Sequence, residues 1–397
     1  MARVLQFSLF LTVVLSFTAL VHLYLVRRLA RDPGLPARAR RVVTVVIVLL
    51  GVSLPLAMLL GRVLPFGSLR LLQQPAYVWM GTMCLLAAAL LLTDLGRALL
   101  WLGERVGARL GRRLPPFPSR AQSVGVRRAA ALVALLVGLG GTAYGVVHAV
   151  GGPVVVRIEV PLPGLPARLD GLRLVQLSDL HVGGGLGGAR LARIVAQVQA
   201  RQPDLIAITG DLVDGAPEQL LPELEPLRRL QAPLGVYFVT GNHEYYSGVE
   251  RWIPEFERLG LRVLRNEAVA LPPDAPGFTL LGIDDSHARS LATGHGADLH
   301  GALAGATPGL PQVLLTHQPA AALQAAQHGV GLVLAGHTHG GQLWPFTLFV
   351  RLQQPFLAGL YTLGDTRLWV SQGTGWWGPP LRLGTDSELT EIVLRAR

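Results

Sequence analysis

Long apolar stretches without a charged side chain alternate with arginine-rich connectors through the first 155 residues. Each stretch is about as long as a helix needs to cross roughly 30 Å of hydrocarbon, so the pattern predicts four transmembrane helices. A buried core helix is the alternative for any one stretch, but four of them between arginine-rich connectors favour a membrane domain. The third is the weakest, because it is short and runs into Asp94 and Arg97. The predicted helices span about residues 4–26, 42–61, 76–93 and 129–150.

The pattern changes after residue 155. Between residues 172 and 259 short apolar runs alternate with longer amphipathic ones, and further short apolar runs continue to residue 370. Such alternation is typical of strands flanked by helices. Residues 156–397 are therefore predicted to form one α/β (α+β) domain, in which a layered sheet is covered by helices and the later part is richer in strands. Residues 1–155 form the membrane domain that precedes it.

Charge separates the same two regions. The chain carries 35 basic and 25 acidic side chains, a net charge of +10. Residues 1–155 hold 17 arginines and three acidic residues, a net of +14, whereas residues 156–397 hold 18 arginines and 22 acidic residues, a net of −4. Because the second domain is net acidic, we expect no nucleic-acid partner. The single cysteine, Cys84, excludes a disulfide within the chain.

The connectors predict how the helices cross the membrane, because short loops rich in arginine stay in the cytoplasm. Six arginines lie in the first connector and eight in the third, against two in the second. This distribution places residues 156–397 on the extracytoplasmic side of a cell (inner or plasma) membrane, in a multi-pass protein.

Residues 95–113 alternate apolar side chains with arginine at helical spacing, which predicts either a helix lying on anionic headgroups or a solvated extension of the third helix.

Polar side chains follow five of the predicted strands at the point where each strand ends. In open α/β sheets the functional crevice lies beyond the carboxyl ends of the strands, so we expect the five loops to converge on one site. Asp, Asn and His together offer oxygen and imidazole ligands, which suit Mn, Fe or Zn better than Ca or Mg alone. The candidate residues are Asp179, His181, Asp211, Asp214, Asn242, His243, His317, His337 and His339.

Five short motifs carry these residues: Asp-x-His at 179–181, Gly-Asp-x-x-Asp at 210–214, Gly-Asn-His-Glu at 241–244, the lone His317, and Gly-His-x-His at 336–339. Taken together, they resemble the motifs of the calcineurin-like metallophosphoesterases, most of all those of the branch of transmembrane proteins with a metallophosphoesterase domain. The match spans about residues 172–342. It implies a four-layer sandwich of two sheets flanked by helices, with two divalent ions at the strand ends.

The resemblance also implies a role for each motif residue. Asp211 would bridge the two ions, and a hydroxide between them would attack phosphorus in line with the leaving oxygen. His243 would stabilise the developing charge or protonate the leaving group, and Asp214 would orient its imidazole. One ion would be held by Asp179, His181, Asp211 and His339, and the other by Asp211, Asn242, His317 and His337.

Two classes of function follow. The first is a membrane-anchored enzyme that hydrolyses phosphodiester or pyrophosphate bonds of a phosphorylated lipid, an envelope substrate or a small-molecule phosphodiester. Within it, a UDP-2,3-diacylglucosamine pyrophosphatase of lipid A synthesis is the alternative, although its cytoplasm-facing site conflicts with the predicted orientation. The second class is a non-catalytic metal-binding sensor module, which the complete ligand set disfavours. The oligomeric state stays open.

Substrate contacts are expected outside the five motifs. The resemblance suggests Arg382, since relatives carry an arginine near the C-terminal end, and arginine suits bidentate contact with phosphate. Asp284 belongs to a second candidate cluster with Asp285 and His287.

Residues 345–361 carry one charge, at Arg351. They predict either a core hairpin or an apolar lip that dips into the lipid bilayer with Phe346, Phe349 and Phe356.

Overall fold

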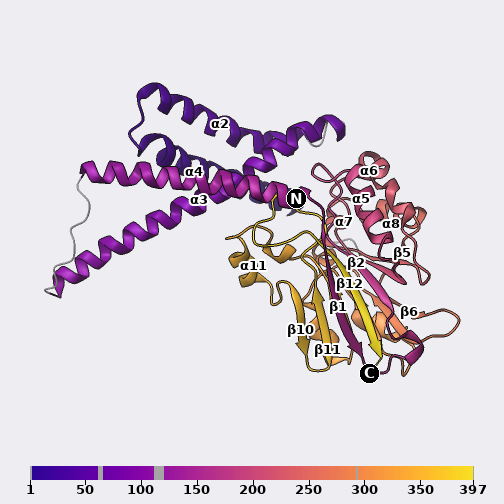
Figure 1. The fold of residues 1–397 in the computed structure, drawn as a ribbon. Coiled ribbons are helices and arrows are strands. Elements are labelled where there is room, and N and C mark those ends of the chain that lie inside the picture. Colours follow the sequence, from indigo (N-terminus) through magenta and orange to yellow (C-terminus); the bar gives the residue numbers. More distant parts are fainter. Residues whose placement is uncertain (1, 61–65, 111–119, 292–293, 397) are drawn as a thin grey trace. The chain divides into compact units, whose positions relative to one another are not determined.

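The structure is a computed structural model that describes residues 2–60, 66–110, 120–291 and 294–396 (Figure 1). It divides into two compact units, Met1–Val146 and Val147–Arg397. The sequence prediction placed the boundary a little later, between residues 155 and 156. The two units are described separately.

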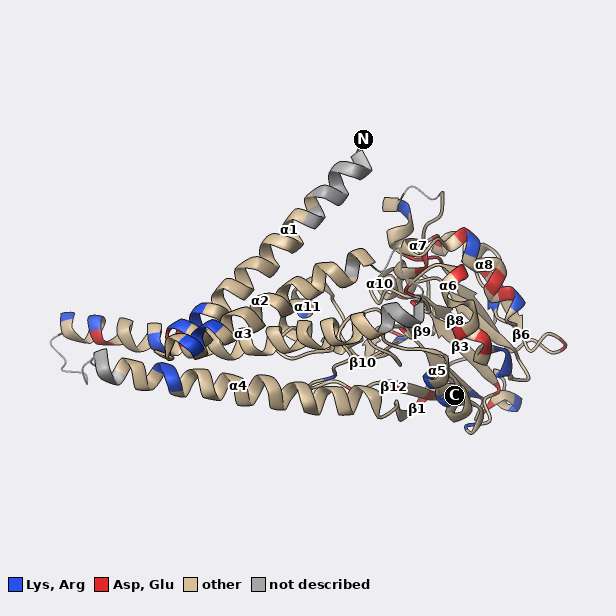
Figure 2. Ribbon diagram, turned by 90° about the horizontal axis from the view of Figure 1, so that it is seen from above, with Lys and Arg blue, Asp and Glu red and all other residues tan. Residues whose placement is uncertain are grey.

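The first unit consists of long helices. Four of them are long and apolar enough to cross a membrane, judged by length and composition, as the apolar stretches predicted. Figure 2 shows these helices as mostly uncharged, with arginines on short parts of them. Their bounds are α1 (Ala2–Leu25), continued by the π-helix η1 (Val26–Arg31), α2 (Ala37–Leu60), α3 (Phe66–Arg109) and α4 (Arg120–Val150).

Asp94, which interrupts the third apolar stretch, is paired inside this unit. Its carboxylate accepts a hydrogen bond from the Tyr24 hydroxyl at 2.7 Å and lies 2.6 Å from the Arg28 guanidinium. Arg28 is buried and also pairs with Asp32 at 2.7 Å. Because charged groups in apolar surroundings persist where they pair with one another, this cluster joins α1 and η1 to α3.

Helix α3 continues without a break to Arg109, beyond its predicted end at residue 93. Residues 95–109 therefore extend the third helix, which is one of the two predicted alternatives, and contact of this part with anionic headgroups stays a prediction. The remaining residues of that predicted segment, 111–113, lie outside the described residues.

Two mixed six-stranded sheets form the centre of the second unit. The first has the order β1-β12-β2-β3-β4-β5 and is parallel except where β12 meets β2. The second has the order β10-β11-β9-β8-β7-β6 and is antiparallel only at its two edge pairs. The strands are β1 (Val154–Leu162), β2 (Arg173–Leu177), β3 (Leu205–Thr209), β4 (Val236–Val239), β5 (Arg262–Val263), β6 (Glu267–Leu271), β7 (Phe278–Gly282), β8 (Gln312–Leu315), β9 (Leu332–Ala335), β10 (Gly359–Leu363), β11 (Thr366–Val370) and β12 (Glu388–Ala396).

Apolar side chains from the facing sides of both sheets meet in one core. Leu174 of β2 and Leu205 of β3 belong to the same buried cluster as Leu280 of β7 and Val313 of β8. All five residues of β3 are buried. A strand covered on both faces needs apolar side chains at nearly every position, which explains why the sequence shows continuous runs instead of strict alternation.

Helices cover the outer face of each sheet. Phe256 of α8 packs on Phe238 of β4 with ring centroids 4.8 Å apart, and Ala325 of α10 packs in one cluster with Leu314 of β8. The layers are thus helix, sheet, sheet and helix, which confirms the predicted sandwich. The helices are α5 (Gly188–Gln199), α6 (Pro217–Leu224), α7 (Asn242–Tyr246), α8 (Val249–Arg258), α9 (Leu299–Ala304), α10 (Ala321–Gln327) and α11 (Thr347–Gln353), with short 3-10 turns η2 (Ala167–Leu169), η3 (Glu225–Arg229), η4 (Ser286–Leu291) and η5 (His339–Gly341).

Candidate metal centre

The motif residues lie where central strands of the two sheets end. In the first sheet they follow β2, β3 and β4, and in the second they follow β8 and β9. Within each sheet these strands are parallel to one another, so their carboxyl ends meet at one edge. The structure brings the five loops together there, as the spacing of the motifs led us to expect.

The side chains of these loops form three overlapping groups, and in each group one nitrogen or oxygen per residue lies within 4.8 Å of the others. The two outer groups are Asp179, His181 and His339, and Asp211, His317 and His337. The third group, His181, Asp211 and His243, shares a residue with each of them. Asp211 Oδ2 lies 3.1 Å from His317 Nε2 and 3.7 Å from His181 Nε2, so it joins the two outer groups.

The donor set fits divalent metal ions. Oδ1 of Asn242 is buried and has no hydrogen-bond partner among the residues that the structure describes, and an orphaned buried acceptor costs about 1–3 kcal/mol. A cation beside it would remove this cost. Burial and the neighbouring His317 lower the pKa of His337 to about 4, whereas His317 has a raised pKa, because the charge of Asp211 outweighs the opposing effect of burial.

Five motif residues have a left-handed backbone, which residues other than glycine rarely adopt. Their φ angles lie between +48° and +71°. Each such residue costs on the order of 1–3 kcal/mol and persists only where the surrounding structure enforces it, most often at functional sites. The five residues are Asp179, His181, Asp211, His337 and His339.

Two glycines of the motifs allow the loops to approach each other closely. A β-carbon on Gly336 would lie 1.9 Å from Ser178 Oγ and 2.3 Å from Asp179 Oδ2. A β-carbon on Gly241 would lie 2.2 Å from Asp211 Oδ1. Any larger residue at either position would displace a carboxylate of the site, so close approach accounts for both glycines.

Asp214 connects the first metal group to His243. Its Oδ1 lies 2.6 Å from His243 Nδ1 and 2.9 Å from His181 Nδ1. Burial opposes ionisation of Asp214, but the charges and hydrogen bonds of the two histidines outweigh it and lower the pKa of the carboxyl. Burial likewise opposes protonation of His243, yet Asp211 and Asp214 raise its pKa to about 9. Asp214 thus orients two imidazoles at once, where the sequence predicted one.

Glu244 is a residue of the site whose role the sequence reasoning missed. Its buried carboxylate accepts hydrogen bonds from the backbone N–H groups of Gly241, Asp211 and Leu212 at 2.7, 3.0 and 2.7 Å, and from that of Val213 at 3.3 Å. Burial raises the pKa of Glu244 to about 7. Glu244 lies three residues after the N-cap Gly241, and its carboxylate accepts from the N-cap N–H, which is one half of a capping box; a Glu at this position is the signal that could have identified it.

Two exposed aromatic residues stand beside His243. The Tyr246 ring lies 5.3 Å from the His243 ring and the Trp377 ring lies 6.3 Å from it, both edge-on. More than half of each side chain is exposed. They form an open aromatic rim beside the candidate catalytic histidine.

Arg382 is placed differently from the sequence expectation. Its side chain is fully buried, and its guanidinium donates to the backbone carbonyls of His339, Gln372, Gly373 and Gly375 at 2.6–3.0 Å. Nothing of the guanidinium is exposed to a substrate, which corrects the predicted phosphate contact. Arg382 instead joins the loop after β11 to His339, the last of the histidine ligand candidates.

Asp284 is also engaged inside the fold. The Arg265 guanidinium donates to both oxygens of its buried carboxylate, at 3.2 and 2.9 Å, so the expected substrate contact is corrected here as well. The member of this cluster that lies beside the site is His287. Its ring lies 6.2 Å from that of His337 and is nearly half exposed, and it accepts a hydrogen bond from Gln318 at 2.7 Å.

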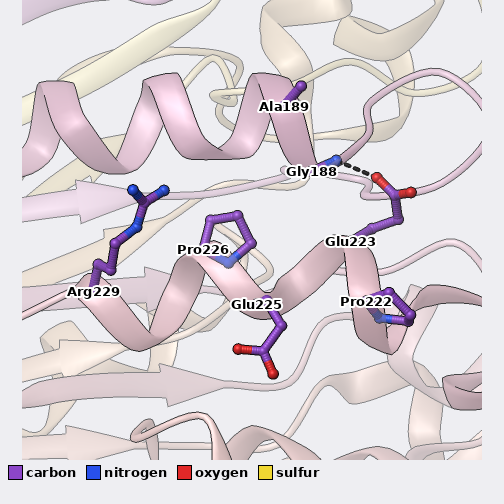
Figure 3. A pocket seen from close by; sticks show the side chains of 7 residues that line it. All are labelled: Gly188, Ala189, Pro222, Glu223, Glu225, Pro226 and Arg229. Carbon is purple, nitrogen blue, oxygen red and sulfur yellow. Dashed lines mark hydrogen bonds between the residues drawn. The ribbon is translucent and has the colours of Figure 1, made fainter.

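A surface pocket of about 490 Å³ lies away from these loops, between the start of α5 and the segment formed by α6 and η3 (Figure 3). In it Glu223 accepts a hydrogen bond from the Gly188 N–H. None of the motif residues lines this pocket, and we assign it no role. It is lined by Gly188, Ala189, Pro222, Glu223, Glu225, Pro226 and Arg229.

Comparison with known proteins identifies relatives of this chain. A transmembrane protein with metallophosphoesterase domain from Danio rerio is 45% identical over 260 residues, which cover 64% of this chain and 60% of that protein. The protein of the same description from Bos taurus is 41% identical, with 64% and 59% covered. This chain thus spans about 60% of the length of these two relatives. An uncharacterized metallophosphoesterase from Aquifex aeolicus is 31% identical, and the match covers 57% of this chain and 86% of that protein.

The sequence profile of the calcineurin-like phosphoesterases matches residues 172–341, the region that carries all five motifs. With those motifs gathered around Asp211 at the edge of two packed sheets, the chain belongs to the calcineurin-like metallophosphoesterase family.

Proposed function

We propose that this protein is a membrane-anchored, metal-dependent hydrolase of phosphodiester or pyrophosphate bonds in a phosphorylated lipid or another envelope substrate. The observation that carries the proposal is that carboxylate and imidazole side chains gather on both sides of Asp211. Divalent ions bound there would polarise the phosphoryl oxygens and acidify a water for attack on phosphorus.

The proposed ligands follow from the two outer groups. Asp211 would contribute to both ions, which its distances to His181 and His317 support. The unpartnered Oδ1 of Asn242 supports its place beside the second ion. The proposed sets are Asp179, His181, Asp211 and His339 for the first ion, and Asp211, Asn242, His317 and His337 for the second.

His243 would act on the substrate directly. Asp214 binds its Nδ1, so Nε2 is the ring nitrogen left to donate a proton to the leaving oxygen or a hydrogen bond to the phosphoryl group. Its partly exposed ring, beside Tyr246 and Trp377, would meet the substrate at the rim of the site.

Activity of the purified full-length protein tests this proposal. We expect Mn²⁺-dependent hydrolysis of bis(p-nitrophenyl) phosphate that EDTA abolishes and Mn²⁺ restores. Asp211→Asn and His243→Ala should each lower kcat by about a hundredfold or more, because general acid catalysis alone contributes about 10²–10⁴. The matched control is His300→Ala, an exposed histidine outside the motifs, which should keep full activity. Full activity of either site variant would overturn the mechanism.

A further inference from the structure

Helix α11 and the residues before it expose an unusual amount of apolar surface in the second unit. No residue of α11 is buried. Arg351 is the single charged residue between positions 344 and 361. We call the exposed set the apolar face; its members, with their exposed fractions, are Trp344 (49%), Phe346 (52%), Leu348 (55%), Phe349 (61%) and Leu352 (83%).

The apolar face is separate from the core hairpin that the sequence left as an alternative. That hairpin, β10 with β11, begins only at Gly359. Phe356, which the sequence grouped with the lip, is buried and packs on Tyr361 with ring centroids 5.0 Å apart. The lip is therefore shorter than predicted and ends before Phe356.

The apolar face is fixed directly against a loop of the metal centre. Gly341, two residues after His339, has φ +83°, and a β-carbon there would lie 2.5 Å from Thr347 Cα at the start of α11. The Trp344 N–H donates to the Leu383 carbonyl at 3.0 Å. A membrane or protein surface that contacts α11 therefore lies close to the candidate ligands.

A clamp on Trp377 ties the rim of the site to the same loop. The side chain of Gln342 donates to the Trp377 carbonyl and accepts from its N–H, both at 2.9 Å. Trp377 is itself 52% exposed, and its ring stands beside His243. One residue, Gln342, thus lies between the apolar face and the aromatic rim.

We propose that the apolar face docks on the lipid bilayer, so that the phosphate of an amphiphilic substrate reaches the metal centre from the membrane surface; the substrate part rests on the proposed function. The bilayer is the occupant that the chain itself supplies. Helix α4, the last helix apolar enough to span a membrane among the residues that the structure describes, ends at Val150, and β1 begins at Val154. Exposed aromatic and leucine side chains with one arginine are the composition that settles at the boundary of headgroups and acyl chains.

Site-directed fluorescence in proteoliposomes tests the docking without any assay of activity. In a Cys84→Ala background, Phe349→Cys carries an environment-sensitive fluorophore, and the protein is reconstituted in vesicles of phosphatidylcholine and phosphatidylglycerol. We expect a blue-shifted emission that brominated phosphatidylcholine quenches. The matched control is Leu323→Cys on α10, a leucine of similar exposure (49%), whose label should emit as in water.

Two results would overturn the docking. One is water-like emission at position 349, equal to that at position 323. The other is a blue shift that brominated lipid does not quench, since this would mean that protein, such as a second copy of the chain, covers the apolar face. Because neither readout depends on turnover, failure of the docking is distinguishable from failure of the proposed function.

A second measurement tests the route of the substrate. The double variant Phe346→Ser and Phe349→Ser should hydrolyse soluble bis(p-nitrophenyl) phosphate at the rate of the parent protein. Its kcat/KM for p-nitrophenyl hexadecyl phosphate in vesicles should fall about tenfold. Equal loss on both substrates would show that the apolar face supports the fold of the site and would overturn its role in presenting the substrate.

Discussion

Backbone strain is concentrated in the residues that carry the candidate ligands. At Asp179, His181, Asp211, His337 and His339 the chain adopts an unfavourable φ directly after a buried strand. The side chains that follow different strands are gathered into overlapping groups there. Strain of this kind is stored where function needs a fixed geometry.

The strain predicts an unusual order of stability at His337, where φ is +71°. Without metal, His337→Gly should be more stable than His337→Ala by about 1 kcal/mol, because glycine lacks the β-carbon that the left-handed region disfavours. Thermal unfolding in detergent with EDTA measures the difference. His317, which has no such φ, should show the opposite order, with alanine the more stable. The same order at both positions would argue against strain at His337.

Glu244 provides a second prediction at this scale. Glu244→Gln should lower the free energy of unfolding by about 1–3 kcal/mol, because both carboxylate oxygens receive backbone N–H donors and one would face an amide NH₂ instead. Denaturant unfolding measures the loss. Glu257→Gln, an exposed residue of α8, is the control and should change stability little. An unchanged midpoint for Glu244→Gln would mean that these hydrogen bonds do not hold the Asp211 loop.

At the scale of the elements, the ends of the strands position the motif residues. The parallel pairing of β2, β3 and β4, and of β8 and β9, carries each motif to the same edge of its sheet. Segments that are distant in the chain then lock these loops. The segment after β11 does so through Arg382, whose guanidinium is spread over four backbone carbonyls.

Arg382→Lys tests this positioning role. Lysine offers a compact ammonium in place of a planar fork, so several of the carbonyls would lose their donor. We expect the free energy of unfolding to fall by about 3 kcal/mol, given about 1.5–3 kcal/mol for each hydrogen bond to a charged group, and the bound metal to decrease. The KM of the metal-loaded fraction for a soluble diester should not change. A raised KM with normal stability would restore Arg382 as a substrate contact; Arg229→Lys, on the surface, is the control.

Charge and hydrophobicity are distributed differently between the two parts of the chain. The first 155 residues hold the excess of arginine and the four apolar helices, whereas the second part is net acidic and includes the carboxylates of the site. Acidic residues that could bind metal therefore account for part of the negative charge, and the high overall pI belongs to the connectors. The basic character of the chain is a property of its anchor.

The connectors predict the orientation of the catalytic unit. A bacterial alkaline phosphatase fused after Arg397 should be active, because that enzyme folds only outside the cytoplasm, and the same fusion after residue 41 should be inactive. Phosphatase activity in whole cells, with expression levels compared by immunoblot, measures the outcome. The reverse pattern would place the site in the cytoplasm and favour the pyrophosphatase alternative.

Much of this protein can be read from the chain alone, because its strongest signals are local. Apolar length predicts the helices that can span a membrane, and Asp, Asn and His at strand ends predict where the site lies. The sequence left open whether the third helix continues beyond residue 93, because an amphipathic pattern fits both an extension and a helix on the membrane surface; the structure shows that α3 continues to Arg109.

Only the tertiary structure decided which candidates face the site. Arg382 and Asp284 have the side chains that a substrate contact needs, yet contacts with segments far along the chain bury both. Glu244 and Asp214 acquire their roles from N–H groups and imidazoles that other loops bring to them. Phe349 is exposed and Phe356 is buried, although both lie in one apolar segment. The sequence by itself determined the elements and the ligand types, because these depend on neighbours in the chain; burial and pairing depend on neighbours in space, which only the packed sheets define.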